Sequence, residues 1–406
     1  MKEKDRRSKN ASVTAAKSRG AEARGGRHEQ RLPPAKSAGP AARTGSKTGA
    51  GGLPPAKSAG PAARTGSKTG AGGPSLKPAP RKAERTSAQN SAPLRRLELR
   101  TGEKPAETVP LILATAATGG YHLIDSGDGE KLEQYGPYRI VRPEAQALWP
   151  KALSASIWEK ADAVFTGDTE EDGMGRWRFP GDVLGETWPM QLLDTDFLGR
   201  FTSFRHVGVF PEQLAHWSWM RDQVAGAGRP LKVLNLFGYT GVASLIAAKA
   251  GAEVTHVDAS KKAIGWAREN QAMARAEKLP IRWICDDAMK FIQREERRGS
   301  RYDVILTDPP KFGRGPNGEV WQLFDHLAAM LDVCREILSP DARGLVLTAY
   351  SIRASFYSIH ELMRETMRGR GGRVESGELI IREGGLDGAR PGRALSTSLF
   401  SRWVPK

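Results

Sequence analysis

From Leu231 to the end, the chain alternates between short apolar runs and longer segments in which apolar residues recur three and four positions apart. Five runs of strand length are each followed by such a segment, at residues 231–237, 252–258, 281–286, 302–308 and 343–351. Parallel strands need long crossover connections, which are usually helices, so this order predicts a parallel sheet with helices on both faces. Two last runs, 372–380 and 396–404, have no helix between them and are expected to pair antiparallel. The predicted fold class is α/β, a doubly wound, seven-stranded, Rossmann-like sheet.

In such sheets ligands lie beyond the carboxyl ends of the strands. The first strand ends in "NLFGYTG", where Gly238 and Gly241 allow a tight turn and a close approach of backbone to ligand. The second ends at Asp258, 20 residues after Gly238, where a carboxylate can accept hydrogen bonds from ribose hydroxyls. The third ends in "CDDA", where Asp287, or alternatively Asp286, can accept from an adenine amine. This set fits a dinucleotide or S-adenosylmethionine.

The turn after the first strand distinguishes these two ligands. It reads "GYTGVA", without the third glycine of the G-x-G-x-x-G fingerprint of dinucleotide-binding folds. S-adenosylmethionine has no phosphate and needs only close backbone approach and two acids. The sequence therefore favours S-adenosylmethionine as the cofactor, and a nicotinamide dehydrogenase remains an alternative.

Residues 200–406 resemble a known family. "LNLFGYTGVASLIAAKAGAEVTHVDASKKAIGWARENQ", "CDDAMKFI" and "YDVILTDPPKFGRG" are similar to the class I S-adenosylmethionine-dependent methyltransferases, and more narrowly to the group that modifies bases of 23S ribosomal RNA. "HVGVFPEQ" (His206 to Gln213) resembles that group's G-x-F-L-D-Q-R segment, with Pro211 and Glu212 in place of Leu-Asp. The resemblance implies a cofactor site formed by Phe210, Gln213, Asn235, Phe237, Gly238, Tyr239, Thr240, Gly241, Asp258, Ala259, Asp286, Asp287, Ala288 and Asp308.

The fourth strand ends in "TDPPKFGRG", which we interpret as the catalytic segment: Asp308, Pro309, Pro310, Lys311 and Phe312. The prolines fix the backbone and remove N–H donors, so that Asp308 and the Pro309 carbonyl are available to accept from an amine. Phe312 is expected to stack on a base and Lys311 to contact phosphate or a carbonyl, with Tyr350 as a second stacking candidate. The glycine-rich stretch Gly313–Glu319 is predicted to be a mobile loop that closes over the substrate.

The cysteines bear on which atom accepts the methyl group. Methylation of a pyrimidine carbon usually needs a cysteine nucleophile, which the resembling carbon methyltransferases carry just after the fifth strand. Here that stretch reads "LTAYS". The chain's two cysteines, Cys285 and Cys334, are expected to lie at the end of the third strand and in a helix core. The sequence thus favours methylation of nitrogen over carbon. Two cysteines alone make no zinc site, and no metal is predicted.

The first hundred residues differ in composition from the rest. They hold 23 of the 62 Lys and Arg, 6 of the 46 Asp and Glu, and no aromatic residue. They also contain an exact duplicate of 21 residues, at Leu32–Gly52 and Leu53–Gly73. Such a segment cannot bury enough apolar area to offset its ordering entropy. It is predicted to be a disordered basic tail, either a solubilising arm or an attractor of RNA.

Three parts are therefore expected: a tail over 1–105, a small mostly-β α+β domain for substrate recognition over 106–222, and the methyltransferase domain over 223–406. The expected function is methyl transfer to a base of structured RNA, with 23S ribosomal RNA as the expected substrate. Alternatives are a methyltransferase of a protein or small molecule, and a non-catalytic RNA-binding protein that keeps the fold. No apolar run is long enough to cross a bilayer and no secretory signal is evident, so no membrane partner and a cytoplasmic location are expected.

Overall fold

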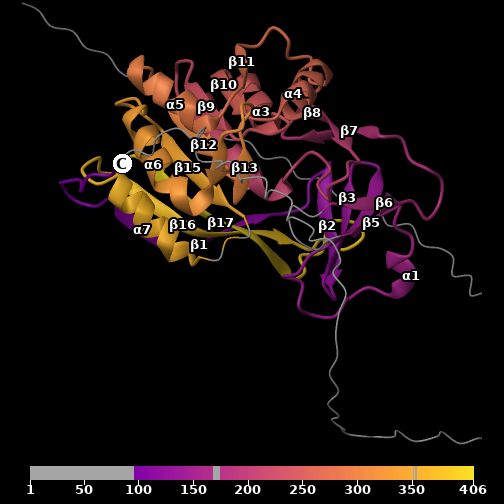
Figure 1. Ribbon diagram of the computed structural model, residues 1–406. Helices are drawn as coiled ribbons and strands as arrows, with labels where there is room; N and C mark the ends of the chain where they lie inside the picture. The colour runs from indigo at the N-terminus through magenta and orange to yellow at the C-terminus, as the bar shows by residue number, and fades with distance from the viewer. Residues whose placement is uncertain (1–95, 168–173, 351, 353) are drawn as a thin grey trace, which may run out of the picture. The chain divides into compact units, whose positions relative to one another are not determined.

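The computed structural model describes residues 96–406 except 168–173, 351 and 353. The predicted tail and its duplicated segment lie almost wholly outside these residues. The described residues form one compact unit. Its centre is an eight-stranded sheet with the strand order β1-β16-β17-β15-β12-β9-β10-β11 (Figure 1). The strands are β1 (Ala106–Thr115), β9 (Lys232–Leu236), β10 (Glu253–Asp258), β11 (Ile281–Cys285), β12 (Val304–Thr307), β15 (Gly344–Ala349), β16 (Arg373–Arg382) and β17 (Ala394–Val404).

The predicted doubly wound α/β sheet is confirmed. The strands β11, β10, β9, β12 and β15 are mutually parallel, and the chain reverses its direction of travel across the sheet between β9 and β12. The two last strands pair antiparallel, as predicted, and β17 is inserted between β15 and β16. An eighth strand was not expected: β1 pairs parallel with β16 at the edge of the sheet, although it comes from the region assigned to the small domain.

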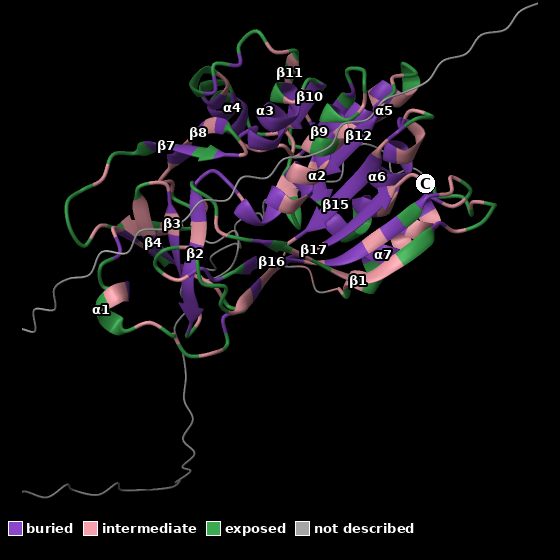
Figure 2. Ribbon diagram, turned by 180° about the vertical axis from the view of Figure 1, so that it is seen from behind, coloured by how far each residue is buried: buried purple, intermediate pink, exposed green. Residues whose placement is uncertain are grey.

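Helices cover both faces of the sheet, as Figure 2 shows by the buried strands between them. The helices are α2 (Leu214–Ala225), α3 (Val242–Lys249), α4 (Lys261–Met273), α5 (Ala288–Arg297), α6 (Leu323–Glu336) and α7 (Phe356–Thr366). Successive side chains of a strand point to opposite faces. Accordingly Val233 and Val304 pack in the core with α2 and α3, whereas their neighbours Leu234 and Ile305 pack in the core with α5, α6 and α7.

The predicted start of α4 is confirmed by its cap. The Ser260 hydroxyl accepts a hydrogen bond from the N–H of Ala263 at 3.2 Å and so satisfies one of the free donors of the first turn. Asp287 caps α5 in the same way, with its carboxylate accepting from the Lys290 N–H at 2.9 Å.

The region before Pro211 holds the smaller β-structure. A five-stranded sheet has the order β2-β3-β4-β5-β6, and a hairpin of β7 and β8 lies between it and α2 in sequence. The bounds are β2 (Tyr121–Gly127), β3 (Glu130–Tyr135), β4 (Tyr138–Pro143), β5 (Ala163–Gly167), β6 (Gly175–Arg178), β7 (Thr187–Leu192) and β8 (Thr195–Arg200), with the short helix α1 (Ala155–Trp158). The buried Glu133 carboxylate pairs with the Arg142 guanidinium at 2.7 Å across this sheet.

The predicted loop Gly313–Glu319 comprises the turn of a short hairpin and the last two residues of its first strand, and its mobility stays a prediction. Residues 312–314 (β13) and 320–322 (β14) form an antiparallel hairpin. The sequence pattern missed it because its strands have three residues each and its turn is rich in Gly, Pro and Asn. Among the described residues, no helix combines the length and the apolar character that a membrane crossing requires.

Candidate functional site

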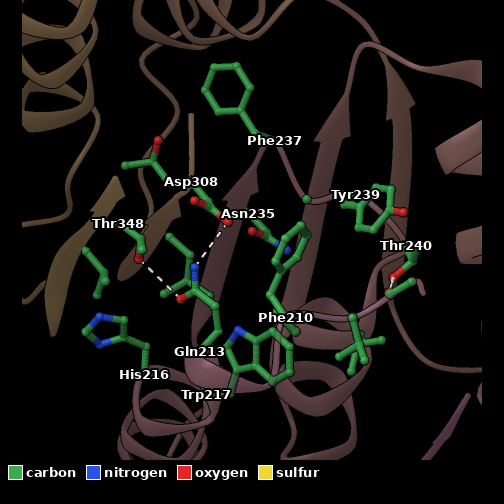
Figure 3. A pocket seen from close by; sticks show the side chains of 18 residues that line it. Phe210, Gln213, His216, Trp217, Asn235, Phe237, Tyr239, Thr240, Asp308 and Thr348 are labelled. Carbon is green, nitrogen blue, oxygen red and sulfur yellow. Dashed lines mark hydrogen bonds between the residues drawn. The ribbon is translucent and has the colours of Figure 1, made fainter. Parts of the chain in front are cut away.

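A cavity lies at the carboxyl ends of β9, β12 and β15, beneath the N-terminal part of α2 (Figure 3). The strand order reverses at this point, so that the connections after β9 and β12 leave toward opposite faces of the sheet. Ligands usually bind at such a point in this kind of sheet. Its lining residues are Gly208, Val209, Phe210, Gln213, His216, Trp217, Asn235, Phe237, Gly238, Tyr239, Thr240, Val242, Ala243, Leu306, Thr307, Asp308, Val346 and Thr348.

The loop after β9 is held in an unusual backbone conformation. Phe237, Tyr239 and Gly241 have φ angles of 56°, 52° and 80°. Only glycine adopts this left-handed region without strain, so the two aromatic residues are held there by their surroundings. A Cβ on Gly238 would lie 2.4 Å from the His256 ring, which explains why glycine is needed between them.

Asp258 fastens this loop from the neighbouring strand. Its Oδ2 accepts from the Tyr239 N–H at 2.9 Å and its Oδ1 accepts from the Ser260 N–H at 2.8 Å. Burial raises the pKa of the carboxyl group, and the two N–H donors act in the opposite direction. Each carboxylate oxygen can accept more than one hydrogen bond. The side chain therefore keeps capacity for a ligand while it holds the loop.

Gln213, at the start of α2, connects the ends of two strands, β12 and β15. Its Nε2 donates to Asp308 Oδ2 at 3.1 Å and to the Tyr350 hydroxyl at 3.2 Å, and its Oε1 accepts from the Thr348 hydroxyl at 3.2 Å. Figure 3 shows the amide between Thr348 and Asp308. The Gln213 side chain is 6% exposed. This network fixes the orientation of the Asp308 carboxylate.

The segment "DPPKF" divides into an inner and an outer part. Asp308 lines the cavity, and the Pro310 carbonyl accepts a hydrogen bond from the Trp321 indole N–H at 2.7 Å. Lys311 and Phe312 point outward, and the Phe312 side chain is 48% exposed. The Trp321 ring also packs on Phe237 at 5.1 Å between centroids. Trp321 therefore connects the loop after β9 to the loop after β12.

Comparison with known proteins agrees with this geometry. A model of S-adenosylmethionine-dependent methyltransferases matches residues 169–368. The crystal structure of a methyltransferase of this kind from Agrobacterium tumefaciens is 75% identical, with a TM-score of 0.75 over 76% of this chain and 98% of that chain. The chain belongs to the S-adenosylmethionine-dependent methyltransferases. Its cofactor is accordingly S-adenosylmethionine.

More distant relatives of this methyltransferase have names that specify a substrate. The ribosomal RNA large subunit methyltransferase I of Tolumonas auensis is 32% identical over 50% of this chain and 49% of its own length. The K/L enzyme of Chromohalobacter salexigens is 27% identical over 52% of this chain and 27% of its own. The chain thus spans about half the length of these curated relatives, or less. A putative methyltransferase solved with S-adenosylhomocysteine shares the fold, at 16% identity and a TM-score of 0.52.

The methyltransferase structure brings part of the predicted site together. The predicted residues that line the cavity are Phe210, Gln213, Asn235, Phe237, Gly238, Tyr239, Thr240 and Asp308. Tyr350 joins them through Gln213 and through its ring, which lies 5.4 Å from that of Phe210. Phe210 also lies 5.8 Å from the Tyr239 ring. The aromatic rings and the glycine loop thus form one wall of the cavity.

Other predicted residues lie outside the cavity: Gly241, Asp258, Ala259, Asp286, Asp287, Ala288, Pro309, Pro310, Lys311 and Phe312. Asp287 is occupied as the cap of α5, and Asp286 pairs with the Arg294 guanidinium at 2.5 Å. Burial raises the pKa of Asp287, with the Lys290 N–H opposing it. Both carboxylates therefore have structural partners in addition to any role toward adenine.

Several lining residues of the methyltransferase cavity were not predicted from the sequence, among them His216, Trp217 and Thr348. His216 and Trp217 read as ordinary residues of an amphipathic helix, and Thr348 as one of several small residues in "LTAYS". Burial, with a smaller contribution from Arg402, lowers the pKa of His216 to about 3. Its imidazole is therefore neutral at physiological pH.

Neither cysteine lies in the cavity. Cys334 is fully buried in α6, and burial raises its thiol pKa strongly. Cys285 donates to the Ala259 carbonyl at 3.6 Å, and burial raises its pKa as well.

In the described part of the chain, the side chains of Glu107, His360 and Glu361 come close enough together to suggest a metal site. Lys104 pairs with Glu361 at 2.6 Å, however, and Arg364 with Glu107 at 3.0 Å. The His360 Nε2 also lies 2.9 Å from Glu107. These cationic side chains already neutralise the carboxylates, so the cluster is better explained as an ion-pair network that ties β1 to α7.

Proposed function

We propose that this methyltransferase transfers a methyl group to a base nitrogen of structured RNA, with 23S ribosomal RNA as the substrate. The observation that carries the proposal is the Asp308 carboxylate, held by Gln213 at the cavity wall beside the glycine loop. A fixed carboxylate at that place can accept a hydrogen bond from an exocyclic or ring N–H. It thereby aims the nitrogen lone pair at the methyl group, which is catalysis by positioning.

The cofactor supplies an electrophilic methyl group on sulfur. We propose that the loop Asn235–Gly241 and Phe210 hold it, with Asp258 toward its ribose and Asp286, Asp287 and Ala288 toward its adenine. The left-handed loop and the Gly238 clearance support this assignment, because both bring backbone close to the cavity. The carboxylate of Asp258 has one N–H donor on each oxygen and further acceptor capacity.

Two observations support nitrogen rather than carbon as the acceptor. A thiolate nucleophile requires a lowered pKa, and burial raises the pKa of both cysteines. In addition, Cys334 is fully buried in a helix core and has no route to a substrate. Amine methylation needs no covalent intermediate, and the oriented Asp308 suits it.

The support for RNA comes from the relatives and from the rim of the cavity. The curated relatives are named as ribosomal RNA large subunit methyltransferases. Next to the cavity, Lys311 and Phe312 are exposed, and Tyr350 is partly exposed. A cation and aromatic faces are the groups that bind unpaired nucleotides. The basic first hundred residues add a non-specific attraction to RNA.

The proposal is tested by incubating the full chain with labelled S-adenosylmethionine and 23S ribosomal RNA transcribed without modifications. Mass mapping then locates the added methyl group. We expect one methylated base nitrogen. Methylation of a ring carbon would overturn the nitrogen assignment. Labelling of a protein or small molecule alone would overturn the RNA assignment, and binding of RNA without transfer would indicate a non-catalytic protein.

We further propose that residues 106–222 recognise the substrate, that residues 223–406 carry the chemistry, and that the protein acts in the cytoplasm. The separate five-stranded sheet within 121–178 supports the first division. Crosslinking to the transcript, read out by peptide mass, tests it: contacts confined to 223–406 would overturn the recognition role.

A further inference from the structure

The hairpin β13–β14 has one face turned into the protein and one turned to solvent. Paired residues of a hairpin lie on the same face, and neighbours alternate. Gly313 is paired with Trp321, whose side chain is 3% exposed. Phe312 is paired with Gln322, and Arg314 lies two residues beyond Phe312 on the same face. All three of these outer residues are exposed.

The inner face fixes the hairpin firmly. Trp321 packs on Phe237 and His326, and its indole N–H donates to Pro310. The Glu319 carboxylate is 1% exposed and pairs with the Lys290 ammonium of α5 at 2.6 Å. It also accepts from the Asn317 N–H at 2.8 Å. The contacts of the inner face therefore hold the outer face in place.

Aromatic and cationic groups gather on that surface. The Phe312 side chain is 48% exposed, and the Arg314 guanidinium lies 5.8 Å from the centre of its ring. Phe324, in the first turn of α6, follows two residues after Gln322 and is 63% exposed. Of the two acids in residues 310–325, Glu319 is turned inward and paired, which leaves Asp325 as the exposed one. Exposed aromatic rings beside cations are the elements of a platform for single-stranded nucleic acid.

We infer that this outer face, formed by Phe312, Arg314, Gln322 and Phe324, binds unpaired nucleotides that flank the target base. The inference rests on the proposed RNA substrate and adds a second contact region outside the cavity. Asp308 lines the cavity and the hairpin begins four residues later, so flanking nucleotides pass over this face when the target base is inserted. Phe312 and Phe324 stack on bases, and Arg314 contacts a phosphate.

The test uses the full chain and two probes, a mixed-sequence single-stranded RNA of twelve nucleotides and the corresponding duplex. The variants are Phe312→Leu and Phe324→Leu, which keep an apolar side chain but remove the flat ring, together with Arg314→Ala. Arg297→Ala is the matched control, because Arg297 is also exposed but lies in the last turn of α5, at the other end of the strands. Fluorescence anisotropy gives affinity, and calorimetry with S-adenosylhomocysteine verifies folding and cofactor binding.

We expect each leucine variant to weaken single-strand binding about tenfold, with little change for the duplex, and to raise the KM for transcribed 23S ribosomal RNA similarly. Phe324→Trp keeps a flat aromatic ring at this position, so we expect it to bind the single strand like the wild type and unlike Phe324→Leu. Arg314→Ala lowers the slope of log affinity against log salt by about one, and Arg297→Ala does not. Ultraviolet crosslinking assigns the contact to residues 312–324, as distinct from the basic tail.

Two failures are distinguishable. If the wild-type chain methylates the transcript and the leucine variants bind and react like the wild type, the role of the outer face is wrong and the proposed function stands. If the wild-type chain transfers methyl groups to no RNA and its variants differ only toward a protein substrate, the proposed function is wrong as well.

Discussion

At the scale of single residues, the site depends on a few side chains that are held in place by other side chains. The Asp308 carboxylate accepts a hydrogen bond from the Gln213 amide nitrogen. The amide oxygen of Gln213 in turn accepts one from the Thr348 hydroxyl. An Asn at position 308 would keep the shape of the side chain. It would, however, turn an NH2 group either toward the Gln213 donor or toward the amine of the proposed substrate.

We expect Asp308→Asn to lower kcat by about 100-fold, the order of effect seen when one preorganised polar group is removed from an active site. The affinity for S-adenosylhomocysteine should change by less than tenfold. Single-turnover methylation and calorimetry measure the two quantities. Full activity in the variant would contradict the role of the carboxylate in orienting the amine, and loss of cofactor binding in a folded variant would make it a cofactor ligand.

Gly238 is the second position where one residue decides the site. Alanine there places a methyl group 2.4 Å from the buried His256 ring. We expect Gly238→Ala to lower the free energy of unfolding by about 1–3 kcal/mol and to weaken cofactor binding. Thermal denaturation and calorimetry provide the measurements.

Gly265 of α4 supplies the control, because a Cβ there meets nothing within 4 Å. Gly265→Ala should stabilise the protein by about 0.5–1 kcal/mol, since alanine favours helix. Equal effects of the two substitutions would show that the clearance at Gly238 is unimportant.

At the scale of elements, the β13–β14 hairpin depends on one carboxylate. Burial acts to raise the pKa of Glu319, but the Lys290 ion pair and the Asn317 donors outweigh it and hold the pKa at about 2. A carboxyl with a depressed pKa stabilises the folded state fully above its unfolded pKa, here 4.5, and loses this contribution as the pH falls toward 2.

We therefore expect hydrogen exchange of residues 312–322, corrected for its intrinsic pH dependence, to become faster as the pH is lowered from 4.5 toward 2. In Glu319→Gln the exchange should already be fast at pH 7 and lose most of this pH dependence. The exchange of α3, which does not contact Glu319 in the described structure, is the internal control. An unchanged hairpin in the variant would contradict the anchoring role.

The elements also show how far the sequence could predict the structure. The strands that carry Asn235, Asp258 and Asp308 were predictable because each is a buried apolar run followed by a helical pattern. The hairpin was not, because it is held by Trp321 and Glu319, whose partners Phe237 and Lys290 belong to other segments of the chain. His216 and Trp217 were missed because a lining residue on a helix has the same pattern as a core residue.

At the scale of the whole molecule, the smaller sheet is joined to the large one through Arg393. Its guanidinium pairs with Asp125 at 2.6 Å and with Glu383 at 3.0 Å, and both carboxylates are buried. Glu383 also accepts from the Ser126 N–H at 2.9 Å. The sequence could not reveal this contact, since more than 250 residues separate Asp125 from Arg393.

We expect Arg393→Met to lower the free energy of unfolding by about 3 kcal/mol, because it leaves two buried carboxylates without their cation. Urea denaturation followed by tryptophan fluorescence measures it. In the wild-type protein residues 96–406 should unfold in one transition, and two transitions with an unaffected smaller sheet would contradict the linkage. Arg390→Met, an exposed arginine of the same loop, is the control.

The edge strand β1 has a consequence for how the protein is made. β1 pairs with β16, 266–267 residues further along the chain, since Ala106 pairs with Arg373 and Thr115 with Ile381. At translation rates of about 5–20 residues per second, this strand waits roughly 13–50 seconds for its partner on the ribosome. Pro110 interrupts its pairing register and removes one N–H donor, which limits pairing with other nascent chains in that interval. Pro110 therefore makes the unpaired strand a poorer template for pairing with a neighbouring chain.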